Sequence, residues 1–255
     1  MNFQVFNTDP ALRPFIRQYW LITGRQEQPD PIELLPDGGV SLVVNLGDGI
    51  HSSRFGMRWC EEGTLIVGAQ TRGDTQLLLG ESLMFGITFK PGGFTFFHRY
   101  DPMDRMADDV QPFDRSQFPN PELILRQPAA YVDRFYLERL KPPRFSLAEV
   151  VASVEQRMGR VRMDELMRLH CTTARQLERQ FKQQLGITPK EFIDLTRFNH
   201  AFEVVQREGG TRSMMDIAWN CGYYDHAHMA NAFQKHMGRP PGNFVLSDSS
   251  KIALA

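Results

Sequence analysis

Two stretches of the chain place hydrogen-bonding side chains on one face of a predicted helix. The first, residues 172–189 (TTARQLERQFKQQLGITP), carries Arg175, Glu178, Arg179 and Lys182 on its polar face. Arginine and lysine attract phosphate groups, and a carboxylate can accept a hydrogen bond from cytosine N4. This face has no bulky apolar residue, so its side chains are suited to contact a nucleic acid.

The second stretch, residues 225–241 (DHAHMANAFQKHMGRPP), has a polar or small face of a different composition. It carries His226, Ala227, Ala230, Asn231 and Gln234. An asparagine side chain can hydrogen-bond to adenine. The same type of surface therefore occurs twice, with fewer charges in the second copy.

The spacing of the structural residues in the two stretches is identical. The first copy has Thr173, Leu177, Phe181, Gly186 and Pro189. The second has Asp225, Met229, Phe233, Gly238 and Pro241, each 52 residues later. Leucine–phenylalanine and methionine–phenylalanine pairs at i,i+4 would attach each helix to the short helix before it. A helix, a tight turn and a second helix form a helix-turn-helix, whose second helix enters the DNA major groove.

Start and stop signals predict the helices that position these faces. Capping residues followed three positions later by Glu, Gln or Asp occur at Ser146, Thr173, Thr188 and Ser213, and Asp225 caps the last helix. The helix from Pro189 to about Glu208 has Leu195, Phe198, Phe202 and Val205 on one face and ends at Gly209. About 18 residues span roughly 27 Å, which suits two major-groove segments roughly 34 Å apart.

The first half of the chain has a different pattern. Thirteen of the 16 prolines lie at or before Pro143, and short apolar runs alternate with Gly-rich turns. This predicts a sandwich or barrel of short strands, with a hairpin turning at Gly80–Glu81 and a short helix in PGGFTFFHRY. An amphipathic helix follows in AAYVDRFYLERL, and Pro142–Pro143 indicates a linker. The expected fold is α+β, with residues 1–140 β-rich and ending in a helix, a linker at 141–145, an all-α domain at 146–246 and a tail at 247–255.

Composition indicates a soluble globular protein. Residues 149–246 contain 13 Lys and Arg against 11 Asp and Glu, a net of +2, within a chain whose formal net charge is −1.

The three cysteines, Cys60, Cys171 and Cys221, are far apart, so neither disulfides nor a structural zinc site is expected. The first twenty residues lack a basic segment followed by an apolar run, and a cytoplasmic location without membrane contact is expected.

Residues 145–246 resemble the two-motif DNA-binding domain of AraC-type transcription regulators. The segments that carry the resemblance are DELMRLHCTTARQLERQF, GITPKEF and DIAWNCGYYDHAHMANAFQKHMGRPP. Residues before them, including RPFIRQYW, LLPDGGVSLVVNLGDG and ITFKPGGF, are similar to a poorly characterised β-rich sensor domain. The resemblance implies binding of double-stranded promoter or operator DNA and a response to a small-molecule effector of unspecified identity.

The resemblance also implies which side chains face DNA. These positions are Ala174, Arg175, Glu178 and Arg179, with Lys182 beside them, and His226, Ala227, His228 and Asn231. Cys171 stands where a turn glycine is usual in the family, and Asn231 stands where arginine is common. We therefore expect the second helix to bind more weakly or to recognise adenine.

Other functions fit the sequence less well. A metal-dependent β-barrel enzyme would need converging ligands, but the first half offers only His51 and His98, in unlike contexts. His226 and His228 point about 200° apart on a helix and cannot chelate one ion. No catalytic residue, metal site or cofactor is predicted. An interaction module with a helical appendage remains an alternative, and contact with RNA polymerase, homodimer formation and the direction of regulation are left open.

Overall fold

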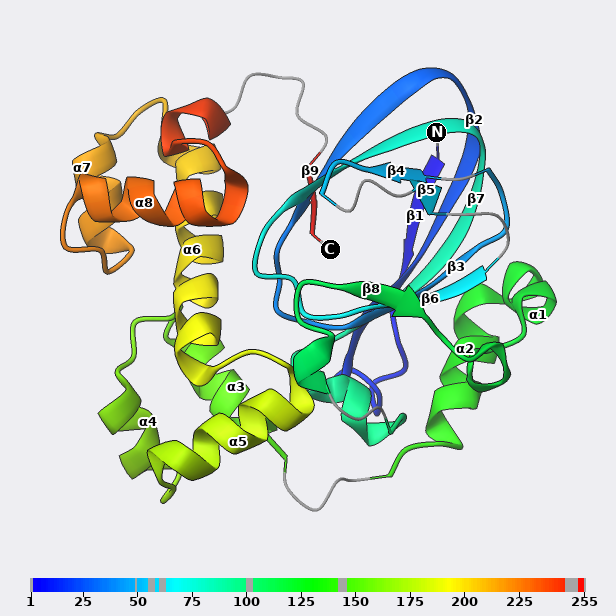
Figure 1. The fold of residues 1–255 in the computed structure, drawn as a ribbon, viewed down its shortest axis with the longest axis horizontal. Helices are drawn as coiled ribbons and strands as arrows, with labels where there is room; N and C mark the ends of the chain where they lie inside the picture. The colour runs from blue at the N-terminus through cyan, green and yellow to red at the C-terminus, as the bar shows by residue number, and fades with distance from the viewer. Residues whose placement is uncertain are drawn as a thin grey trace.

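The computed structural model describes residues 2–48, 50–54, 58–59, 63–99, 103–141, 146–245 and 252–254. A β-rich part lies beside a helical part, and the long helix α6 runs through the helical part between two groups of shorter helices (Figure 1). The expected α+β class is confirmed. The linker prolines Pro142 and Pro143 lie outside the described residues.

One mixed sheet forms the β-rich part. Its strands are β1 (Asn2–Phe6), β2 (Ile16–Leu35), β3 (Ser41–Asn45), β4 (Ile50–Ser52), β5 (Arg58–Trp59), β6 (Gly63–Val67), β7 (Asp74–Phe89), β8 (Val110–Pro112) and β9 (Ile252–Leu254). The main path of pairing is β1-β2-β7-β3-β6-β8, with β4 and β5 branching from β7. Among the strands that the structure describes, all pairs are antiparallel except β2 with β9. The terminal strands β1 and β8 do not pair in the described part, so the sheet is open rather than a closed barrel.

The hairpin expected at Gly80–Glu81 is wrong. Strand β7 continues through these residues and pairs with β2 along almost its whole length, with a register irregularity between Gln26 and Asp30. Gly80 has a φ of 80°, and the Asp48 carboxylate accepts a hydrogen bond from the Glu81 N–H at 2.7 Å. A glycine in the left-handed region therefore bends this strand without reversing it.

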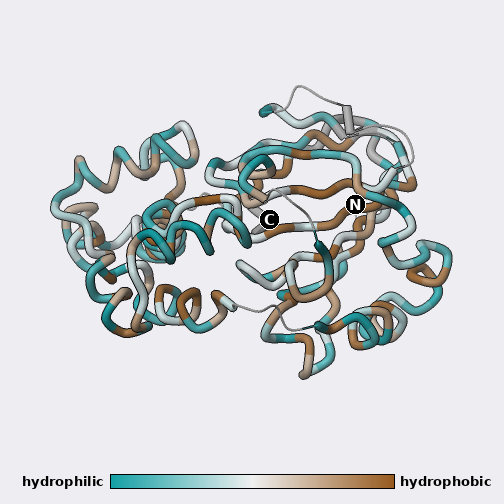
Figure 2. The backbone as a smooth tube through the Cα atoms, turned by 60° about the horizontal axis from the view of Figure 1, so that its bottom comes forward, coloured by the Kyte–Doolittle hydropathy of each residue, from teal (hydrophilic) through white to brown (hydrophobic). Residues whose placement is uncertain are grey.

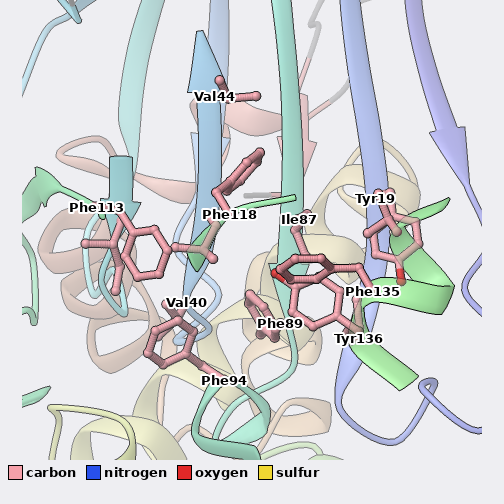
Figure 3. Close-up of a cluster of buried hydrophobic side chains, with 14 of the residues drawn as sticks. Tyr19, Val40, Val44, Ile87, Phe89, Phe94, Phe113, Phe118, Phe135 and Tyr136 are labelled. Atoms are coloured by element: carbon pink, nitrogen blue, oxygen red, sulfur yellow. The ribbon is translucent and has the colours of Figure 1, made fainter. Parts of the chain in front are cut away.

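Aromatic side chains fill the core between the sheet and the helices that follow it. Helices α1 (Pro121–Arg126) and α2 (Pro128–Leu137) lie beside the sheet, and α2 contributes Val132, Phe135 and Tyr136 to the core. Phe89 of β7 packs edge-on against Tyr136, and Phe94 of the short 3-10 helix at Gly93–Phe96 packs edge-on against Phe89 (Figure 3). That 3-10 helix confirms the short helix expected in PGGFTFFHRY, and its rings belong to the core.

Within the described residues 146–245, the helical part has six α-helices. They are α3 (Ala148–Gln156), α4 (Met163–Leu169), α5 (Ala174–Gln184), α6 (Pro189–Glu208), α7 (Met214–Asn220) and α8 (His226–Met237), followed by a 3-10 helix at Pro241–Phe244. The capping box expected at Ser146 is wrong. Helix α3 begins only at Ala148, and Ser146 Oγ accepts from the Ala148 N–H at 3.1 Å instead of reaching Glu149. The other predicted N-caps are confirmed.

Two separate cores hold the helical part together. One packs α3, α4 and α5 against the start of α6 around Leu177 and Phe181, and the other packs α7 and α8 against the rest of α6 around Met229 and Phe233. Hydrophobic segments run along the strands of the sheet, whereas the helices alternate between polar and apolar positions (Figure 2). The predicted apolar face of α6 is confirmed, since all four of its named residues are buried.

Candidate nucleic-acid interface

The first helix-turn-helix consists of α4 and α5. Thr173 is the N-cap of α5, and its side chain accepts from the Gln176 N–H at 3.3 Å. Leu177 and Phe181 are fully buried, which turns the opposite face of α5 to solvent. The exposed residues on that face include all five that the sequence predicts to contact DNA, which are Ala174, Arg175, Glu178, Arg179 and Lys182.

The turn between α4 and α5 is strained at one residue. Cys171 has a φ of 47°, in the left-handed region that glycine adopts without penalty. Its counterpart in the second motif is Gly222, with a φ of 80°. Cys171 therefore occupies a backbone conformation that favours glycine, which agrees with the turn glycine usual at this position.

The second helix-turn-helix consists of α7 and α8, with Asp225 as the N-cap of α8. The Asp225 carboxylate accepts from the His228 N–H at 2.7 Å, and His228 Nδ1 lies 3.4 Å from the Tyr224 N–H. His228 thus takes part in local capping, although its side chain remains exposed, as do His226, Ala227 and Asn231. Met229 and Phe233 are fully buried and hold α8 in place.

The long helix α6 joins the two motifs rigidly. Its first turn has a complete capping box between Thr188 and Glu191. The Arg197 guanidinium donates two hydrogen bonds to Gly159 O, at 3.1 and 2.9 Å. Arg160, next in the same turn, donates to Asn220 O at the end of α7 at 3.1 Å. These contacts link the turn before α4 to α6 and to the second motif. They hold the two recognition helices, which are α5 and α8, in one relative orientation.

The two recognition helices differ in charge. In the part of the chain that the structure describes, Arg175 and Arg179 form no ion pair, so both guanidinium groups are available to a ligand. Lys182 instead donates to Gly186 O at 3.2 Å, at the end of its own helix. The N-terminal half of α8 has no lysine or arginine, so its exposed face is neutral or weakly basic.

The C-terminal ends of both recognition helices rest on the β-rich part. At the end of α5, Gly186 is so close to the chain at Met103 that a Cβ would lie 2.3 Å from Met103 O. At the end of α8, His236 Nδ1 lies 2.6 Å from Thr71 O, and the Gly73 N–H donates to His236 O at 2.7 Å. Figure 1 shows both helices directed toward the sheet at these ends.

Further contacts connect the two parts at α6 and just after α8. Asn199 Nδ2 donates to Pro36 O at 2.8 Å, and Arg239 forms an ion pair with Glu33 of β2. Leu35 belongs to the core of the second motif, and Ala69 belongs to the core of the first. The β-rich part therefore contributes to both helical cores, and its Ala107 also packs against the core of the first motif.

Asp108 organises the loops that receive the two recognition helices. Its carboxylate accepts from Thr71 N at 2.7 Å and Thr71 Oγ1 at 2.5 Å, and it forms an ion pair with Arg54 at 2.7 Å. Burial opposes ionisation of this carboxyl, but the Thr71 hydrogen bonds and Arg54 outweigh burial and lower its pKa. The pKa of His236 is also lowered, chiefly because burial disfavours the imidazolium. Both groups lie at the boundary between the two parts.

Metal-binding chemistry finds no support in the described residues. No group of three His, Cys, Asp or Glu there could hold an ion. His98 is a core histidine beside Phe94 and Tyr136, and burial lowers its pKa to about 4, whereas His51 is exposed on β4. The described cysteines, Cys171 and Cys221, are free, and Cys60 lies outside the described residues.

Comparison with known proteins agrees with this architecture. Residues 156–246 match a helix-turn-helix domain model, and residues 4–112 match a domain of unknown function (DUF6597). The HTH-type transcriptional regulator ArgR of Pseudomonas aeruginosa is 31% identical over 78 residues, covering 31% of this chain and 23% of that protein. The HTH-type transcriptional activator RhaS of Escherichia coli O139:H28 is 30% identical over 81 residues, covering 32% and 28%.

A crystal structure of ToxT from Vibrio cholerae is 10% identical with a TM-score of 0.47, covering 89% of this chain and 97% of that one. The chain spans about a quarter of the length of the curated relatives it matches. Residues 156–246 thus form a helix-turn-helix domain, as the repeated spacing predicts, and the relatives that match this region are transcription regulators. No helix among the described residues is long and apolar enough to cross a membrane.

The sequence patterns do not reveal several residues of this region. Thr71, Gly73 and Asn199, which dock the two parts on one another, lie in no motif. His236 is marked only by its position three residues after the buried Phe233. Trp219 and Tyr224, both exposed beside α8, have no marking pattern at all.

Proposed function

We propose that residues 146–246 bind duplex DNA as one unit, with α5 and α8 in successive major-groove segments on one side of the duplex. The observation that carries this proposal is the pair of exposed recognition faces held by one rigid helix. Helix α6 has 20 residues and is about 30 Å long, close to the roughly 34 Å between successive major grooves.

The DNA contacts of this proposal are unequal between the motifs. We assign them to Ala174, Arg175, Glu178, Arg179 and Lys182 in α5, and to His226, Ala227, His228 and Asn231 in α8. Arg175 and Arg179 supply charge and base contacts, whereas α8 supplies neutral hydrogen-bonding groups. The small net charge of the domain implies modest non-specific affinity.

Footprinting on duplex selected by the wild-type protein tests this assignment. Two protected patches about ten base pairs apart on one face are expected. Arg175→Ala should weaken binding by about 1–3 kcal/mol and relax base preference at one or two positions. Asn231→Arg should raise affinity and steepen the salt dependence by about one phosphate contact. A single patch, or weaker binding by Asn231→Arg, would contradict the proposed roles.

The β-rich part is proposed to sense a small molecule and to control DNA binding without contacting DNA. The proposed division is residues 1–140 for the sensor, 141–145 for the linker, 146–246 for the DNA-binding domain and 247–255 for the tail, of which Ile252–Leu254 form strand β9 on the sensor sheet. Docking of both recognition helices on the β-rich part supports this role. An effector that favours one arrangement of the two parts changes DNA affinity by its differential binding, typically 1–3 kcal/mol.

A matched pair of glycine substitutions tests the control. In Gly73→Ala the new Cβ would lie 2.5 Å from Met237 Sδ and 3.0 Å from Leu34 O, whereas in Gly242→Ala it meets nothing within 4 Å. Gly73→Ala should change the response of a reporter promoter to the inducing condition while preserving the footprint. Gly242→Ala should behave like the wild type. Equal responses from both variants would show that this contact plays no part in control.

The remaining partners follow from the same proposal. The protein acts in the cytoplasm, and one copy occupies each two-patch site, with no need for a homodimer. Contact with RNA polymerase is a separate property that output from the reporter promoter would test. The match to transcription regulators makes an enzyme unexpected.

A further inference from the structure

An exposed aromatic pair stands beside the second recognition helix. Trp219, near the end of α7, is 60% exposed, and Tyr224, the residue before the N-cap of α8, is 85% exposed. Trp219 Nε1 donates to Tyr224 O at 3.1 Å, which ties the indole to the turn. No described residue hydrogen-bonds to the Tyr224 hydroxyl. Large aromatic side chains normally bury most of their surface, so this pair is unusual for a surface without a partner.

The extra residue of the second turn is Tyr224. In the first motif the left-handed Cys171 is followed by Thr172 and then by the N-cap. In the second motif the left-handed Gly222 is followed by two residues, Tyr223 and Tyr224, before the N-cap. Tyr223 turns into the core and is 5% exposed. The longer turn therefore adds one outward-facing phenol at the start of α8.

Trp219 takes the place of a cation. Helices α4 and α7 have the same length, and the sixth residue of each is Arg168 and Trp219 respectively. The Arg168 side chain is 78% exposed. Where the first motif offers a guanidinium beside its recognition helix, the second offers an indole.

We propose that Trp219 and Tyr224 contact the DNA backbone next to the groove that α8 occupies. This inference rests on the proposed DNA binding and is continuous with that interface, because a recognition helix enters the groove with its N-terminus first. The Tyr224 hydroxyl donates to a phosphate oxygen, and the Trp219 indole packs on the adjoining deoxyribose. Tyrosine and helix N-termini are established donors to phosphate. The pair thus supplies, without charge, the backbone contact that the weakly basic face of α8 lacks.

The chemistry of a neutral contact gives it a distinct signature. A hydrogen bond from a phenol releases no bound counterions, so its loss lowers affinity without changing the salt dependence of binding. Loss of a guanidinium lowers both the affinity and the salt dependence of binding. A backbone contact also carries no base information, so base preference stays the same.

The test uses the full chain and a duplex of about 30 base pairs selected from a random pool by the wild-type protein. Tyr224→Phe removes only the hydroxyl and should weaken binding about three- to tenfold with an unchanged salt slope. Trp219→Ala should weaken binding to a similar degree. Met158→Ala, a matched change at another exposed apolar residue of the domain, should leave affinity unchanged. Arg175→Ala should reduce the salt slope by about one.

Tryptophan fluorescence gives an independent readout. The difference between the wild type and Trp219→Phe isolates the Trp219 emission, which should change when the duplex is added. The inference is overturned if Tyr224→Phe and Trp219→Ala bind like the wild type. It is also overturned if they bind normally but lose reporter output, which would assign the pair to a protein partner. If the wild type itself selects no duplex at low salt, the proposed function fails, and this inference fails with it.

Discussion

Removing the charge of Asp108 should loosen the junction between the two parts of the molecule. Asp108 has a φ of 59°, a conformation that asparagine tolerates as well as aspartate. Asp108→Asn therefore preserves the backbone and the shape of the side chain. It replaces one acceptor oxygen by an NH2 group, so at least one of the three donors from Thr71 and Arg54 loses its acceptor.

The expected cost follows from these contacts. Hydrogen bonds to a charged group contribute about 1.5–3 kcal/mol each when desolvated. The Asp108 side chain is 31% exposed and that of Arg54 is 19% exposed, so solvent screens part of the ion pair. Because Asn can still accept at one oxygen, a total loss of about 1–3 kcal/mol in the free energy of unfolding is reasonable.

Urea denaturation of the two variants Asp108→Asn and Asp104→Asn gives the comparison. Asp104 is exposed in the 3-10 helix Met103–Arg105, four residues before Asp108, and undergoes the same change of charge. Asp108→Asn should be the less stable by about 1–3 kcal/mol at pH 7. Because the pKa of Asp108 is lowered in the folded protein, its stabilising effect is complete above the unfolded value of 3.8 and declines as the pH falls through the folded pKa. Equal stability of the two variants at pH 7 would refute the role assigned to Asp108.

Three further predictions concern stability and pH. Cys171→Gly should stabilise the protein by about 0.5 kcal/mol, because relief of the left-handed backbone strain exceeds the entropy cost of glycine. Cys171→Ala keeps a Cβ and should not stabilise the protein, and thermal denaturation compares the two variants. Gly159→Ala should cost about 2–4 kcal/mol in urea unfolding, because φ is 68° and a Cβ would lie 2.5 Å from Arg197 N and Ile193 O. His236 has a lowered pKa, so its stabilising contribution is complete above 6.5 and falls as the pH drops below that value. His236→Gln should therefore show a weaker loss of unfolding free energy between pH 7.5 and 5.5. An unchanged pH dependence would assign the loss to the buried His98 and the half-buried His200, whose pKa values are also lowered by burial.

The helix-turn-helix part is largely determined by local sequence. Caps at Thr173, Thr188 and Asp225 satisfy main-chain N–H groups within three residues, so each helix start is encoded beside the helix itself. The apolar period of α6 and the i,i+4 pairs of α5 and α8 likewise depend on short spacing. The nine predicted contact residues are exposed for the same reason, although their binding to DNA stays a prediction.

The β-rich part and the junction were decided by tertiary structure. Gly80 marks a turn in the sequence, but the long pairing of β2 with β7 and the Asp48 carboxylate keep the strand continuous through it. The Thr71–His236 contact joins residues 165 positions apart, and no local pattern specifies which loop meets the end of α8. Local sequence specifies the two recognition helices and the helix between them, because caps and periodicity act over a few residues. Only the packed structure decided where those helices rest, because docking depends on shapes and hydrogen-bonding groups that the fold brings together from distant parts of the chain.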